Sequence, residues 1–402
     1  MSNRMPRGEF VALIAMMFAT IAFSIDSMLP ALPQISAQLS PGDANKAQLI
    51  LTSFVLGMGI GTFFTGPLSD AFGRKPVIYV GSALYILSAA VAWATSSLEM
   101  LLIARIFQGI GSAAPRVVAM AIIRDLYSGR EMARIVSIAM MIFTLVPAIA
   151  PMMGAGVIAL AGWRGIFASF MLFSLTTITW MGLRLSEPLA PENRRPLRLP
   201  LMIDAARQMF AHPTVRVSIM VQTLCLGMLF TMLTMVQPVY DIIYDRADSF
   251  PFWFGFVALM AGSASLLNAT LVIRLGMRRI VTWTLGAQII FTCFVMVMNG
   301  LDLSDGASFA LFVSWQTAVF FMAGMTMGNL NAIAMEPMGH IAGMAASVIG
   351  AVSTVLAAAV AAPLGQLFDG SILPLAIGVL TMCTMGFGLM LYMGRIEDRL
   401  PA

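Results

Sequence analysis

The segment Gly66-Pro67-Leu68-Ser69-Asp70-Ala71-Phe72-Gly73-Arg74-Lys75-Pro76 joins two long apolar runs, residues 47–68 and 77–95. Gly66 and Gly73 permit a very tight turn and a close approach of the flanking helices. Asp70 can pair with Arg74 or with a neighbouring helix end, which predicts a latch that breaks and re-forms during a conformational change. The alternative is an ordinary basic loop beside a membrane, and the full string, including Lys75, argues against it.

The apolar runs on either side of this segment belong to a series that fills the chain. The 402 residues are 59% hydrophobic and 10% charged, whereas soluble domains carry about 45–50% apolar and about 25% charged residues. Since about 20 apolar residues cross a bilayer as a helix, the sequence predicts an all-α membrane protein with twelve transmembrane helices. The predicted spans are residues 9–32, 47–68, 77–95, 99–121, 133–159, 163–184, 214–238, 251–273, 279–299, 308–333, 342–367 and 371–393. The first run is too long for a signal peptide and is expected to be retained.

The basic residues between the runs predict the orientation. Eighteen fall on the side of the N-terminus: Arg4, Arg7, Arg74, Lys75, Arg124, Arg130, Arg134, Arg184, Arg194, Arg195, Arg198, Arg207, Arg216, Arg274, Arg278, Arg279, Arg395 and Arg399. Three fall on the other side: Lys46, Arg164 and Arg246. Because cytoplasmic loops carry the excess of Lys and Arg, both termini are expected in the cytoplasm.

The longest polar stretch divides the predicted spans six and six. It runs from Glu187 to His212 and contains four prolines, as a linker between two bundles does. The sequence therefore predicts an N-terminal six-helix bundle over residues 1–186, a cytoplasmic linker over 187–212 and a C-terminal six-helix bundle over 213–402.

Two ionisable side chains inside the spans are the candidates for chemistry. Arg105 opens the string Arg105-Ile-Phe-Gln-Gly109-Ile-Gly111-Ser-Ala-Ala of the fourth span, where the glycines favour close helix packing. Asp26 is the only acidic residue well inside a predicted span, and counting residues places it at about the same depth as Arg105. Charges at this depth are expensive and usually functional. We expect Asp26 to bind a proton and Arg105 to set its affinity; the alternative is a static ion pair that joins the first and fourth spans.

Other polar residues in the spans are candidates for a substrate cavity. Arg116 lies about three turns from Arg105 on nearly the same helix face, and it either lines the cavity or extends its side chain toward the cytoplasm. The remaining candidates are polar groups that are costly against lipid: Gln222, Gln237, Tyr240, Asn268, Gln316, Asn329 and Asn331.

These motifs together resemble the drug:proton antiporters of the major facilitator superfamily, and most closely the bicyclomycin and chloramphenicol resistance branch. The fifth span carries Pro151 and Gly154, similar to the antiporter motif, although Ala150 stands where that motif has glycine. The resemblance implies two six-helix bundles that alternately open a central cavity to each side, exchanging protons for a hydrophobic or amphiphilic small molecule. It implies a monomer in the bilayer of the bacterial inner membrane, with no metal, cofactor or nucleic acid.

Two other transport functions stay open at this point: export of a specific metabolite, such as an amino-acid derivative or a siderophore, and uptake by proton symport. A membrane enzyme is not favoured, because the spans contain no zinc-protease string, Ser-His pair or carboxylate dyad. The three cysteines are far apart, and the two histidines lie in predicted loops without a second ligand nearby. A metal site is therefore not expected.

Overall fold

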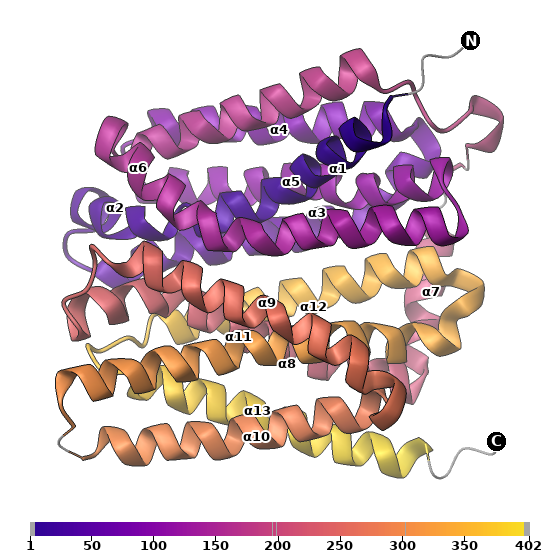
Figure 1. The fold of residues 1–402 in the computed structure, drawn as a ribbon. Coiled ribbons are helices and arrows are strands. Elements are labelled where there is room, and N and C mark those ends of the chain that lie inside the picture. Colours follow the sequence, from indigo (N-terminus) through magenta and orange to yellow (C-terminus); the bar gives the residue numbers. More distant parts are fainter. Residues whose placement is uncertain (1–4, 195, 198, 302, 398–402) are drawn as a thin grey trace. The chain divides into compact units, whose positions relative to one another are not determined.

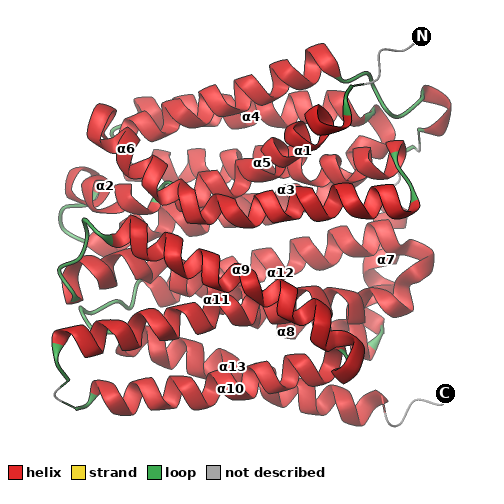
Figure 2. Cartoon of the chain, viewed as in Figure 1, coloured by secondary structure: helices red, strands yellow, loops and turns green. Residues whose placement is uncertain are grey.

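The computed structural model describes residues 5–194, 196–197, 199–301 and 303–397. Within this part of the chain the regular structure is helical and no strand occurs (Figure 2). The chain forms two compact units, Met1–Leu199 and Pro200–Ala402.

The first unit contains six α-helices (Figure 1). They are α1 (Arg7–Asp26), α2 (Leu32–Leu39), α3 (Leu49–Phe72), α4 (Arg74–Ala94), α5 (Leu98–Leu126) and α6 (Gly129–Arg184). The 56 residues of α6 correspond to about 84 Å of helix, nearly three times the hydrocarbon thickness of about 30 Å. Gly162, with φ 65° and ψ −177°, interrupts it. Two spans therefore lie within α6.

The second unit contains seven α-helices and begins within the first of them. They are α7 (Leu199–Ala211), α8 (Pro213–Pro238), α9 (Phe250–Leu275), α10 (Met277–Asn299), α11 (Asp305–Met335), α12 (Ala342–Gly365) and α13 (Leu373–Glu397). A π-helical turn, Val239–Ile243, follows α8. Helix α8 packs against α11, α12 and α13 and is the central helix of the unit.

The predicted spans agree closely with the helices. Eleven helices of the described chain are long and apolar enough to cross a membrane, and the interruption of α6 accounts for the twelfth predicted span. The first predicted span differs: α1 ends at Asp26, and a short 3₁₀ turn, Leu29–Ala31, leads into α2. Pro30 and Pro33 begin these two short elements, because proline fits a first helical turn but interrupts a continuing helix. Helix α7, within the predicted linker, was not foreseen. Of the basic residues used for orientation, Arg4, Arg195, Arg198 and Arg399 lie outside the described residues.

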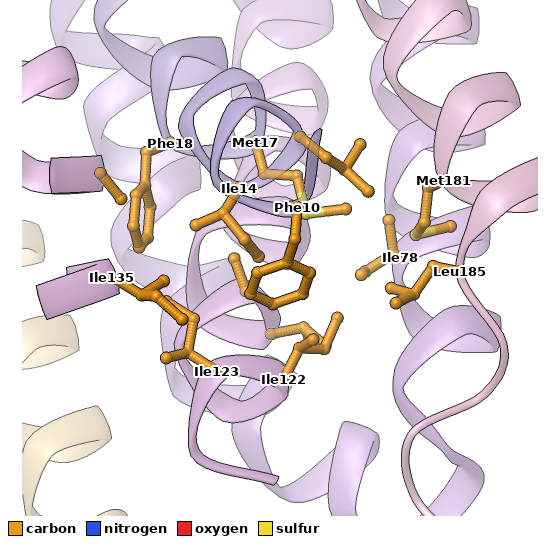
Figure 3. Close-up of a cluster of buried hydrophobic side chains, with 14 residues drawn as sticks. Phe10, Ile14, Met17, Phe18, Ile78, Ile122, Ile123, Ile135, Met181 and Leu185 are labelled. Carbon is orange, nitrogen blue, oxygen red and sulfur yellow. The ribbon is translucent and has the colours of Figure 1, made fainter. Parts of the chain in front are cut away.

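One end of the first unit is held together by a cluster of buried apolar side chains (Figure 3). Phe10 and Ile14 of α1 meet Ile122 of α5, both ends of α6, and Leu185, the residue that follows α6. Leu185 lies two residues before Glu187, so this core fixes the position at which the chain leaves α6.

Candidate functional site

Arg105 is completely buried in the first unit, at 0% exposure. Its Nη1 donates to Oε1 of Gln108 over 2.7 Å, its Nη2 to the carbonyl of Ser24 over 3.1 Å, and its Nε to the carbonyl of Ile50 over 3.3 Å. The guanidinium carbon lies 4.3 Å from the centre of the Phe54 ring, a cation–π distance. Neutral acceptors and an aromatic face from α1, α3 and α5 therefore surround this cation.

Asp26 is the last residue of α1 and is 5% exposed. Its carboxyl group makes no hydrogen bond or ion pair within the described residues. The structure brings Arg105 to the carbonyl of Ser24, two residues before Asp26, but it does not place the two side chains in an ion pair. The predicted direct pairing is therefore not present in this conformation, because the guanidinium directs its donors to neutral acceptors.

Gly109 and Gly111 of α5 allow two neighbouring helices to approach closely. A Cβ atom at Gly109 would overlap the carbonyl oxygen of Phe54 on α3, and one at Gly111 would overlap the carbonyl oxygen of Gly81 on α4. Backbone contacts of this kind cannot be relieved by rotating a side chain. The fourth-span glycines thus bring α3 and α4 up to the helix that carries Arg105.

Gly154 allows α6 to pack closely against the end of α1. A Cβ atom at this glycine would overlap the carbonyl oxygen of Ser27, the residue that follows Asp26. Pro151 is buried one turn earlier in α6. The segment that resembles the antiporter motif therefore packs directly against the chain at the end of α1.

The predicted latch is larger than the sequence indicated. Arg74 is 3% exposed and forms ion pairs with Asp70 over 2.5 Å and with Asp125 over 2.7 Å. Its Nη1 also donates to the hydroxyl of Ser69 over 2.8 Å. Asp125 stands at the end of α5, so the arginine joins the turn between α3 and α4 to a third helix.

Only one of the two predicted turn glycines lies in that turn. Gly73 has φ 105° and ψ 161° and is the sole residue between α3 and α4; this conformation is essentially restricted to glycine. Gly66 instead lies within α3, where its carbonyl accepts from the Ser69 hydroxyl over 2.9 Å. Its predicted place in the turn was wrong, because helix α3 continues past Pro67 to Phe72.

Glu187 completes the turn and was missed as a site residue. Its carboxylate accepts from the backbone N–H groups of Arg74 and Lys75, each over 2.9 Å. A carboxylate at a helix N-terminus satisfies amides that lack helical partners and complements the helix dipole. Lys75 in turn donates from Nζ to the carbonyl of Leu185 over 2.6 Å. The end of α6 is thereby fixed to the start of α4.

In the second unit, some of the cavity candidates are paired with one another. The hydroxyl of Tyr240 donates to Oε1 of Gln316 over 2.9 Å, and Nδ2 of Asn329 donates to Oδ1 of Asn268 over 2.7 Å. These pairs satisfy buried polar groups, as expected inside a helix bundle. Nε2 of Gln316, however, is buried without a partner in the described chain.

The other candidates are less engaged. Gln237 makes a long contact, 3.4 Å from Nε2 to a carboxylate oxygen of Asp241, and Oε1 of Gln222 is buried without a partner among the described residues. Asn331 is half-buried and Arg116 is exposed, and the side chain of neither makes a hydrogen bond or ion pair within the described chain. The place of these residues in a substrate cavity stays a prediction.

The family model of the Major Facilitator Superfamily matches residues 12–362. The chain belongs to this superfamily. Membership of this superfamily indicates a transporter, in agreement with the eleven helices of the described chain that are long and apolar enough to cross a membrane.

Named relatives and solved structures refine this membership. The chain is 29% identical over 347 residues to a bicyclomycin resistance protein homolog of Haemophilus influenzae, covering 85% of each protein. It is 38% identical over 148 residues to a chloramphenicol resistance protein of Pseudomonas aeruginosa, covering 37% of this chain and 35% of that protein. The crystal structure of a D-xylose–proton symporter aligns with TM-score 0.73 at 15% identity, over 96% of this chain and 97% of that one. This last likeness concerns the fold alone.

Proposed function

We propose that this superfamily member exports hydrophobic or amphiphilic small molecules across the bacterial inner membrane in exchange for protons. The observation that carries the proposal is the buried Asp26, whose carboxyl group has no partner in the described chain although Arg105 is bound two residues away. The names of the relatives, bicyclomycin and chloramphenicol resistance proteins, support drug-like substrates.

An exchanger needs one site that gains and loses charge as it alternates between the two sides. A protonated Asp26 is neutral and tolerates its apolar surroundings, whereas its ionised form needs a cation or donors nearby. In the proposed cycle Arg105 supplies that charge when Asp26 releases its proton, and it returns to neutral acceptors when the proton binds. The ion pair expected from the sequence would then belong to a different conformation.

The ion pairs of Arg74 would lock one conformation of the transporter. Asp70, Asp125 and Glu187 hold the start of α4 against α3, α5 and the end of α6. Breaking such contacts would accompany a rocking of the six-helix bundles, residues 1–186 and 213–402, joined by the 187–212 linker. Both termini would lie in the cytoplasm, and the transporter would act as a monomer.

The test uses inside-out membrane vesicles that contain the protein and carry an acidic lumen. Adding chloramphenicol or bicyclomycin should make the lumen more alkaline, because each drug molecule that enters the lumen is exchanged for protons that leave it. Acidification would indicate symport and therefore uptake in the cell. Vesicles with Asp26→Asn provide the matched control, and alkalinisation that persists in them would contradict the role of Asp26. No pH change across a broad panel of antibiotics and dyes would favour export of a specific metabolite.

A further inference from the structure

Tyr85 of α4 is 1% exposed and lies next to the last turn of α1. Its hydroxyl oxygen is 2.6 Å from the hydroxyl oxygen of Ser24. The Ser24 hydroxyl also donates to the carbonyl of Thr20 over 2.5 Å. A serine hydroxyl has one proton, so Tyr85 must be the donor in its bond to Ser24.

This hydrogen bond acts on the residue that also holds the buried cation. The hydroxyl of Ser24 accepts from Tyr85, and its carbonyl accepts from Nη2 of Arg105. Ser24 therefore ties α4 and α5 to α1 at a point two residues before Asp26. The tyrosine reaches this point because Gly111 of α5 lets α4 come close. A Cβ atom at Gly111 would lie 2.7 Å from the backbone nitrogen of Tyr85.

A second buried group at the same place is incompletely satisfied. Gln108 is fully buried and accepts from Arg105 through Oε1, while its Nε2 has no partner in the described chain. Buried donors without acceptors are rare in stable arrangements. This amide is therefore a donor that another polar group at the same place can use.

We propose that Tyr85 is a positioning residue of the proton-coupling site. Its hydroxyl holds the last turn of α1 in the register that lets the ionised carboxylate of Asp26 meet Arg105. The inference rests on the proposed function, in which Asp26 carries the proton. Of the charged and titratable side chains that the structure describes, Arg105 on α5 interacts with this hydroxyl, and Asp26 follows Ser24 by two residues on α1. Helix α6 contributes the apolar ring of Phe170, with its centre 6.4 Å from the tyrosine ring.

The test measures proton release from the purified transporter on adding drug, as a function of pH. Tyr85→Phe removes only the hydroxyl, and Ser24→Ala removes its acceptor while keeping the carbonyl that binds Arg105. Both variants should move the midpoint of proton release to higher pH by about 0.5 unit or more, because the ionised Asp26 would be less well aligned with its cation. Tyr79→Phe, at an exposed position on the same helix, should leave the midpoint unchanged.

The outcomes separate this inference from the proposed function. An unchanged midpoint in either Tyr85→Phe or Ser24→Ala overturns the positioning role, even if transport falls. Should one variant fail to fold, the other removes the same hydrogen bond and decides the matter. Proton release that survives in Asp26→Asn refutes the proposed function itself, whatever Tyr85 does.

Discussion

Gly73→Val is expected to stop the transport cycle while leaving drug binding largely intact. At φ 105° and ψ 161° a residue with a side chain is strained by about 1–3 kcal/mol. Steric overlap adds little, because a Cβ atom there would meet only side-chain ends, Nη2 of Arg194 and Oε2 of Glu187, each at 3.2 Å. Backbone strain at residue 73 that is present only while the ion pairs of Arg74 are intact lowers the population of that conformation, relative to the others, by about 5- to 150-fold.

The second unit offers a matched control. Gly276 connects α9 to α10 with φ 79° and ψ 153°, and a Cβ atom there would meet nothing within 4 Å. Gly276→Val therefore carries similar backbone strain without the ion pairs of Arg74. We expect both variants to lose similar thermal stability, whereas only Gly73→Val loses most of its transport in vesicles. Parallel loss of drug binding and transport in Gly73→Val would refute the reasoning, because the turn would then shape the binding site.

Three further changes test the remaining parts of the site. Asp26→Asn should abolish transport driven by a pH gradient while the protein stays folded in the membrane; normal gradient-driven efflux by this variant would remove Asp26 from the mechanism. Arg105→Ala should shift the midpoint of drug-induced proton release to higher pH and stall export, since the cation that favours ionised Asp26 is lost. Arg105→Lys should move the pH optimum of transport, because an ammonium lacks the planar fork of a guanidinium. Equal midpoints in wild type and Arg105→Ala would show that Asp26 and Arg105 do not interact. Glu187→Gln should lower the free energy of unfolding by about 0.5–2 kcal/mol, as loss of a helix cap does. Glu192→Gln, at an exposed position in the same segment, is the control, and equal free energies of unfolding for the two variants would rule out the cap.

The spans were predictable because they depend on local sequence. A run of about 20 apolar residues is sufficient to specify a membrane helix, and the break at Gly162 falls between the predicted spans 133–159 and 163–184. The short helices α2 and α7 were not found, because neither is long enough or apolar enough to give that signal. The predicted first span, 9–32, ran past the end of α1 at Asp26, because the interruption marked by Pro30 and Pro33 was not used.

The site was predictable only in its residue types. Asp26 and Arg105 attract attention as charges among apolar residues, yet the partners of Arg105 depend on how α1, α3 and α5 pack. Tyr85 carried the same signal more weakly, as a polar group inside an apolar run. Glu187 carried none, because its partners lie 112 and 113 positions away in the sequence and it was read as part of a linker.

The cap formed by Glu187 also decides where the polypeptide can be divided. A version made as two separately expressed fragments has to keep this carboxylate with the first fragment, since α4 would otherwise begin with unsatisfied amides. Arg194 comes close to the same turn, 3.2 Å from a Cβ position at Gly73. A nick or an inserted protease site therefore has to lie beyond Glu187, although the last membrane helix of the first unit already ends at Arg184.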